Sequence, residues 1–137
     1  MTAGYSGTPL AKKLGIKPGF RIYVENGPGH YMKLIAPLPE AVSFVQRPGD
    51  QLNMIHLFTQ EAGSLAAKLK DGMRRIVPDG MIWVSWPKKA SKVPTDVTED
   101  VIRKLALPLG LVDTKVCAVD ETWSGLKLVI RLENRKT

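Results

Sequence analysis

Hydrophobic and polar residues follow one another along the chain in two different periods. Residues 20–24 alternate strictly between the two kinds, which is the two-residue period of a strand. Residues 52–58 and 81–86 are nearly continuous apolar runs, as expected for parallel strands that are covered on both faces. Residues 42–45 form a shorter run of the same kind. The first two thirds of the chain therefore predict four strands.

Helical periodicity lies between these strands. Residues 61–76 predict the longest helix, because apolar side chains recur there at spacings of three and four. Those on the apolar face are Ala62, Leu65, Ala66, Leu69, Met73 and Ile76. Near the N-terminus, Thr8 can cap a short helix, Pro9 suits its first position and Gly15 its end. One or two further helical turns are predicted over residues 30–35.

The last third of the chain predicts one helix and two strands. Asp96 and Glu99 have the spacing of a capping box, so we expect a helix to begin there and to end before Pro108. Residues 112–119 and 126–132 then alternate like strands and are close enough to form a hairpin. The final strand is either a sheet edge available for dimerisation or a strand with one solvated face.

Strands that alternate with helices require parallel crossovers, which are almost always right-handed. We therefore predict an α/β fold: a Rossmann-like three-layer sandwich with a mostly parallel sheet and a C-terminal antiparallel hairpin. A chain of 137 residues fits a single domain, residues 1–137.

Composition narrows the class of protein. No apolar run is long enough to span a bilayer, and no signal-peptide pattern opens the sequence, so we expect a cytoplasmic protein without a membrane partner. Cys117 is the only cysteine, which excludes an internal disulfide and favours an inert sheet residue over a reactive thiol. The net charge of +7 fits either an anionic ligand or partner, or an ordinary solvated basic surface, and we favour the surface. Oligomeric state stays open.

The segment Trp86–Lys92 is the strongest candidate for a site. It follows a buried strand directly, and ligands of open α/β sheets sit beyond the carboxyl ends of strands. Lysines there can hold a phosphate or carboxylate, and a tryptophan can stack on a ring. The alternative is a solvated loop in which Asp96 only caps a helix. The candidate ligand-binding residues are Gly27, Gly29, Trp86, Lys88, Lys89, Ser91, Asp96, Trp123 and Ser124.

The residue types of known catalytic and metal sites are not arranged in a recognisable pattern. His30 and His56 lack metal-ligand spacing with Cys117, so no metal site is predicted, and His56 fits a hydrogen-bonded core histidine. No nucleophile elbow or phosphate-binding loop is present. Asp120 and Glu121 are a carboxylate pair, but such a pair is more typical of an exposed turn. Catalytic residues therefore stay unassigned.

Several segments resemble class I S-adenosylmethionine-dependent methyltransferases. Residues 17–29 resemble their first strand and glycine loop, Val77–Val84 the turn into their fifth strand, and residues 111–132 their last two strands. The resemblance implies a reduced version of the methyltransferase topology, with S-adenosylmethionine as a possible cofactor. Where that family places an acidic residue after the second strand to hold the ribose, this chain has Val45-Gln46. We therefore lean towards a protein that is not an enzyme.

A second resemblance covers most of the chain. Gly4–Lys17, together with residues 86–91, 95–99 and 110–127, resembles the sequence blocks of a family of small bacterial proteins, of actinobacterial type, with no known function. This resemblance implies a bacterial cytoplasmic protein and brings no activity with it.

Three functions remain. The leading hypothesis is a non-catalytic binding or interaction module on a methyltransferase-like scaffold. The second is a small nucleotide or S-adenosylmethionine binder, or a methyltransferase, with the ligand between Gly27–Gly29 and Trp86–Lys89. The third is a nucleic-acid-associated protein that binds through its positive charge.

Overall fold

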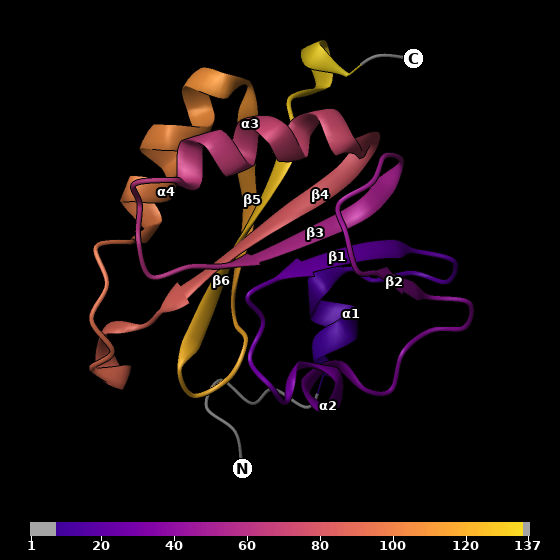
Figure 1. Ribbon diagram of the computed structural model, residues 1–137, viewed down its shortest axis with the longest axis horizontal. Helices are drawn as coiled ribbons and strands as arrows, with labels where there is room; N and C mark the ends of the chain where they lie inside the picture. The colour runs from indigo at the N-terminus through magenta and orange to yellow at the C-terminus, as the bar shows by residue number, and fades with distance from the viewer. Residues whose placement is uncertain (1–7, 136–137) are drawn as a thin grey trace.

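The computed structural model describes residues 8–135, which form a twisted six-stranded sheet between two layers of helices (Figure 1). The strands are β1 (Arg21–Glu25), β2 (Ser43–Val45), β3 (Leu52–Phe58), β4 (Ile76–Pro87), β5 (Leu111–Ala118) and β6 (Trp123–Ile130). The α-helices are α1 (Leu10–Leu14), α2 (Tyr31–Ile35), α3 (Leu65–Arg75) and α4 (Glu99–Ala106). Three short 3-10 helices follow β4, α4 and β6: η1 (Lys89–Ser91), η2 (Leu107–Leu109) and η3 (Leu132–Asn134).

The strand order is β2-β1-β3-β4-β6-β5. β1 runs parallel to β2 and β3, and β3 runs parallel to β4, whereas β6 is antiparallel to both β4 and β5. The predicted mostly parallel sheet with a C-terminal antiparallel hairpin is thus confirmed. The suggestion that the final strand is a sheet edge is wrong, because β6 is inserted between β4 and β5 and leaves β5 at the edge.

The predicted three layers are also confirmed. Helices α1 and α2 cover one face of the sheet, and α3 and α4 cover the other (Figure 1). On the first face, Ile22, Met54 and Trp83 belong to one buried cluster. On the second face, Ile82 and Leu126 belong to another. Alternate residues of each strand therefore supply the two cores, as the strand period requires.

Helix α1 is held to the sheet through its C-terminal carbonyl groups. The indole Nε1 of Trp83 donates to the Leu14 carbonyl at 2.9 Å, and Lys115 Nζ donates to the Lys13 carbonyl at 2.8 Å. Gly15 ends the helix as predicted, with a left-handed φ of 84° that favours glycine. Pro9 occupies the N-cap position, one residue before its predicted place. Orphan carbonyls that would otherwise face the core are therefore partnered.

Two predicted helix starts are wrong. Helix α3 begins at Leu65, because Thr59 Oγ1 accepts from the Glu61 amide and donates to its carbonyl, and the Leu65 amide then donates to the Ala62 carbonyl in a second turn. Helix α4 is capped by Thr98, whose side chain accepts from the Val101 amide. Asp96, the predicted cap, accepts a hydrogen bond from the Ala62 amide instead. Both corrections involve the loops that surround the site described next.

Two further features complete the comparison with the sequence. Cys117 is half-buried in β5, and burial raises the pKa of its thiol, which favours the inert role expected for it. The last strand ends at Ile130, so Leu132, predicted to belong to that strand, lies in η3 and is 77% exposed. Within residues 8–135, no helix has the length and apolar character needed to cross a bilayer.

Candidate functional site

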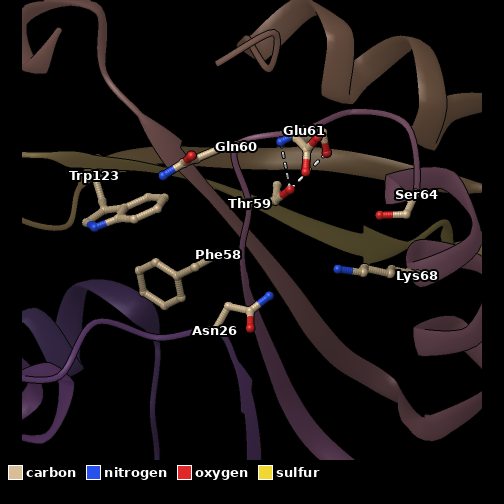
Figure 2. A pocket seen from close by; sticks show the side chains of 8 residues that line it. All are labelled: Asn26, Phe58, Thr59, Gln60, Glu61, Ser64, Lys68 and Trp123. Carbon is tan, nitrogen blue, oxygen red and sulfur yellow. Dashed lines mark hydrogen bonds between the residues drawn. The ribbon is translucent and has the colours of Figure 1, made fainter. Parts of the chain in front are cut away.

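A cavity of about 330 Å³ opens where β1 and β3 end (Figure 2). We call it the crevice; it is lined by Asn26, Phe58, Thr59, Gln60, Glu61, Ser64, Lys68 and Trp123. After β1 the chain moves outward to β2 and then returns to the other side of β1 as β3. The crevice therefore lies at the carboxyl edge of the sheet where the strand order reverses, which is the usual position of ligands in open α/β sheets.

One wall of the crevice is aromatic. Phe58 is the last residue of β3 and Trp123 the first residue of β6. Their ring centroids are 5.1 Å apart and the rings are nearly perpendicular, at 87°. Figure 2 shows both rings on one side of the cavity, facing the polar side chains of Ser64 and Lys68. Phe58 is buried, so the half-buried Trp123 supplies the ring on which a ligand ring can pack, and Phe58 supports it from behind.

The aromatic wall rests on a buried polar network. His56 stacks on Phe58 at a centroid distance of 4.3 Å, and hydrogen bonds join its Nδ1 to Tyr31 Oη at 2.9 Å and its Nε2 to Ser85 Oγ at 2.7 Å. Burial lowers the pKa of His56 to about 3, so the imidazole is neutral. The predicted core histidine is thus confirmed. Because both ring nitrogens of His56 have hydrogen-bond partners, the imidazole is held in one orientation behind the Phe58 ring.

The opposite wall is polar, and its lysine is paired, whereas the exposed carboxylate of the lining residue Glu61 has no ion-pair partner among the described residues. Lys68 projects from α3 and its Nζ lies 2.7 Å from Oε2 of Glu25, the last residue of β1. The lysine charge is therefore neutralised within the protein. Asn26, Gln60 and Ser64 add amide and hydroxyl groups that can both donate and accept hydrogen bonds. This wall suits a neutral or zwitterionic polar ligand better than a phosphate.

A hydrogen-bonded turn positions Trp123. Asp120 Oδ1 accepts from the Thr122 and Trp123 amides, both at 2.8 Å. Its other oxygen lies 3.2 Å from Nε2 of His30, in the loop that follows β1. Asp120 therefore connects the β5–β6 turn to that loop. The sequence predicted an exposed turn here, but the Asp120 side chain is buried.

Of the nine candidate residues from the sequence, Trp123 lines the crevice. Gly27 directly follows the lining residue Asn26, and a Cβ atom there would lie 2.8 Å from Val24 Cγ1. Close packing therefore requires glycine at this position. Gly29 has no heavy atom within 4 Å of a notional Cβ, so nothing in its surroundings demands glycine.

The segment Trp86–Lys92 does not line the crevice. Trp86 is 8% exposed and packs in the core on the α3 and α4 face, so its ring is not presented to a ligand in the crevice. Its register partner Ser124 is part of the sheet. Ser91 Oγ donates to the Lys88 carbonyl and so folds η1, while the neighbouring Lys89 is exposed.

Asp96 acts on the crevice indirectly. Its carboxylate accepts from the Ala62 amide at 2.8 Å, and its own amide donates to the Gln60 carbonyl at 3.3 Å. Thr95 Oγ1 donates to the same carbonyl at 2.7 Å. The loop before α4 thus holds the rim of the crevice, residues 60–62, in place.

Sequence reasoning missed most of the lining residues. Phe58 looked like the end of a buried strand, and residues 61–64 were assigned to a helix. The position of Phe58 at the end of β3 could have identified it. Ligands bind beyond the carboxyl ends of parallel strands in general, and not only beyond the strand that ends near Trp86. In the part of the chain that the structure describes, no cluster of three or more metal-ligating side chains occurs.

Comparison with known proteins decides the family. Residues 50–132 match the family described as "Protein of unknown function (DUF3052)". The chain belongs to this family. The match includes most of the crevice, from Phe58 to Trp123, and of the lining residues only Asn26 lies outside it. The N-terminal block that suggested such a family begins at Gly4, and its first four residues lie outside the described residues. None of the curated proteins searched matches this DUF3052 protein.

Several solved structures similar to the DUF3052 protein are described as methyltransferases. A SAM-dependent methyltransferase from Aquifex aeolicus has a TM-score of 0.65 at 13% identity, covering 88% of each chain. A chain of the complex between the Haloferax volcanii Trm112 methyltransferase activator and a putative methyltransferase has a TM-score of 0.61 at 9% identity, covering 90% of this chain and 89% of that one. Aeropyrum pernix fibrillarin with natively bound S-adenosyl-L-methionine gives 0.55 at 14% identity, covering 92% and 70%. These likenesses establish a Rossmann-like methyltransferase fold.

Proposed function

We propose that this DUF3052 protein is a non-catalytic binding module that holds a small ligand with a flat ring in the crevice. The observation that carries the proposal is the pairing of an aromatic wall, Phe58 and Trp123, with a polar wall across a cavity of about 330 Å³. Small-molecule sites combine these features, with apolar surface for affinity and a few polar groups for orientation. Figure 2 shows the two walls facing each other across the cavity.

The chemistry of the crevice supports ligand binding over catalysis. Among the lining residues there is no histidine or cysteine, and the lysine is paired with Glu25, so the Glu61 carboxylate is the one lining group that could act as an acid or base. The hydroxyl of Thr59 donates to a backbone carbonyl, so it lacks the adjacent base that a nucleophile needs. β2 ends with the half-buried Val45, and the exposed Gln46 follows it, where the methyltransferase resemblance implies an acidic ribose-binding residue.

The first test is a fluorescence and thermal-shift titration with adenosine, S-adenosylmethionine and S-adenosylhomocysteine. Trp123 lies at the crevice while Trp83 and Trp86 are buried, so a ring bound there should quench the emission of Trp123 and raise the Tm. We expect Trp123→Ala to weaken binding by about 5- to 100-fold, from the roughly 1–3 kcal/mol of one stacked base.

Glu121→Ala is the matched control, because Glu121 is exposed in the same turn and does not line the crevice. Its affinity should equal that of the wild type. Unchanged Tm and emission with all three compounds at millimolar concentration would contradict the proposal.

S-adenosylmethionine itself is the second candidate ligand. It is favoured by one observation: fibrillarin, of similar fold, is described with S-adenosyl-L-methionine natively bound. If S-adenosylmethionine and S-adenosylhomocysteine raise the Tm equally at low and high salt, and adenosine does not, S-adenosylmethionine is favoured as the ligand. Detectable conversion of one into the other during incubation with protein or RNA substrates would instead identify a methyltransferase and remove the non-catalytic part of the proposal.

A further inference from the structure

A second cavity lies at the amino edge of the sheet, away from the strand ends that form the crevice. Its volume is about 260 Å³, and it lies where α1 ends and where β3 and β4 begin. We call it the lysine cavity; it is lined by Gly15, Lys17, Phe20, Asn53, Asp79, Gly80, Met81 and Lys127. Nothing in the resemblances or in the crevice accounts for two lysines in one small cavity.

Three lysines gather around this cavity on the α1 face of the sheet. Lys127 projects from β6, and its Nζ would lie 3.7 Å from a Cβ placed on Gly15. Lys115 on β5 is its register partner across the antiparallel pair, a position in which like charges destabilise a sheet. Lys17 joins them from the segment between α1 and β1. Lys115 Nζ also donates to the Lys13 carbonyl, which keeps it close to the helix.

The charge of this group is not balanced within the described residues. None of Lys17, Lys115 and Lys127 forms an ion pair there, although Asp79 lines the same cavity. The crevice differs, since Glu25 neutralises Lys68. The pKa of Lys127 is lowered, first by burial and then by the charges of Lys115 and Lys17. This is the effect expected of a half-buried cation beside other cations. An anion in the cavity would remove this repulsion.

We propose that the lysine cavity binds the phosphate group of a small molecule, with Lys17 and Lys127 as its charged ligands. Lysine binds phosphate as a point charge through its ammonium donors. A Cβ atom on Gly15 would lie 3.7 Å from Lys127 Nζ, so the missing side chain leaves space beside this ammonium group. Asn53 Oδ1 already accepts from the Arg21 amide, so its NH₂ group is available to the ligand. The volume fits a phosphate with a short organic group and is too small to enclose a polymer.

The test is a thermal-shift titration of the full chain in phosphate-free buffer at constant ionic strength. The probes are inorganic phosphate, glycerol 3-phosphate and a single-stranded 20-nucleotide DNA, with chloride as the reference anion. We expect phosphate or its ester to raise the Tm by about 4 °C at ten times its Kd. The ester binding more tightly would identify an organic phosphate, and equal binding would identify free phosphate.

Variants assign the effect to the cavity. Lys127→Gln should abolish the phosphate response and, in chloride alone, raise the Tm because a repelled cation is lost. Lys17→Gln tests the same site from an exposed position should the first variant not fold. Lys70→Gln on α3 makes the same charge change away from the cavity and should respond like the wild type. An equal response of wild type and Lys127→Gln, no response to either phosphate probe, or a shift with the DNA alone would overturn the proposal.

Discussion

His56 shows how a single polar residue can be built into an apolar core. It is fully buried, and both ring nitrogens have partners on other elements: Tyr31 from α2 and Ser85 from β4. The sequence indicated a core histidine because His56 lies within a continuous apolar run. It could not identify the partners, because they are 25 and 29 residues away and meet only when α2 packs on the sheet.

The lowered pKa of His56 has a consequence for stability in acid. Its pKa is about 3 in the folded protein against 6.5 for an unperturbed histidine, so the unfolded state binds the extra proton between these values. Stability should therefore be lost as pH falls from about 6.5 towards 3, by up to about 1.4 kcal/mol per pH unit for this one group. Urea unfolding of the wild type and His56→Gln at pH 4 to 7 measures it.

The variant should show a slope smaller by that amount between pH 4 and 6. His30→Gln is the control for loss of an imidazole, because the His30 side chain is 54% exposed. Identical slopes for wild type and His56→Gln would show that the imidazole is not held neutral.

At the scale of elements, the strands were easier to predict than the helix starts. The bounds of β3 agree with the apolar run at residues 52–58, because a strand buried on both faces admits few polar residues. The sequence predicts a start of α3 that is four residues too early, because Ala62 continues the helical spacing. In the structure the hydrogen bonds of Thr59 to Glu61 form a turn before the helix instead. Periodicity reports which face is buried, whereas hydrogen bonds of single side chains decide where a helix begins.

The start of α4 gives a direct test of this distinction. Thr98→Ala removes the side-chain acceptor of the Val101 amide and should lower the free energy of unfolding by about 1 kcal/mol. Ser64→Ala is the matched control, because Ser64 is the N-cap of α3 but makes no capping hydrogen bond through its side chain. Chemical denaturation of both variants is sufficient, and a loss at Ser64 equal to that at Thr98 would contradict the assignment.

At the scale of the whole molecule, the site could be predicted in its location but not in its residues. The rule that ligands bind beyond the carboxyl ends of strands indicated the edge of the sheet at which the crevice lies, and Trp123 was a candidate because its ring can stack on a ligand. The rule itself brought in Trp86, whose side chain points into the core instead. The crevice combines residues from β1, β3, α3 and β6, and only the strand order places these elements side by side.

The strand order also sets which part of the sheet opens first. β2 has three residues, lies at an edge and pairs with β1 alone, whereas β3 is buried and paired on both sides. We expect the amides of β2 to exchange with deuterium at least tenfold faster than those of β3, because edge strands open without global unfolding. Residue-resolved hydrogen exchange by NMR measures the difference, and equal protection of Phe44 and Ile55 would contradict it.

The insertion of β6 between β4 and β5 has a consequence for synthesis of the chain. β5 is made before β6, yet every ladder that joins β5 to the sheet passes through β6. During translation β4 therefore presents an open edge, and β5 has no place in the sheet until residues 123–130 have left the ribosome. A chain interrupted before Trp123 would lose two strands of the sheet and the Trp123 ring of the crevice together, so assembly of the sheet and completion of the crevice are a single late event.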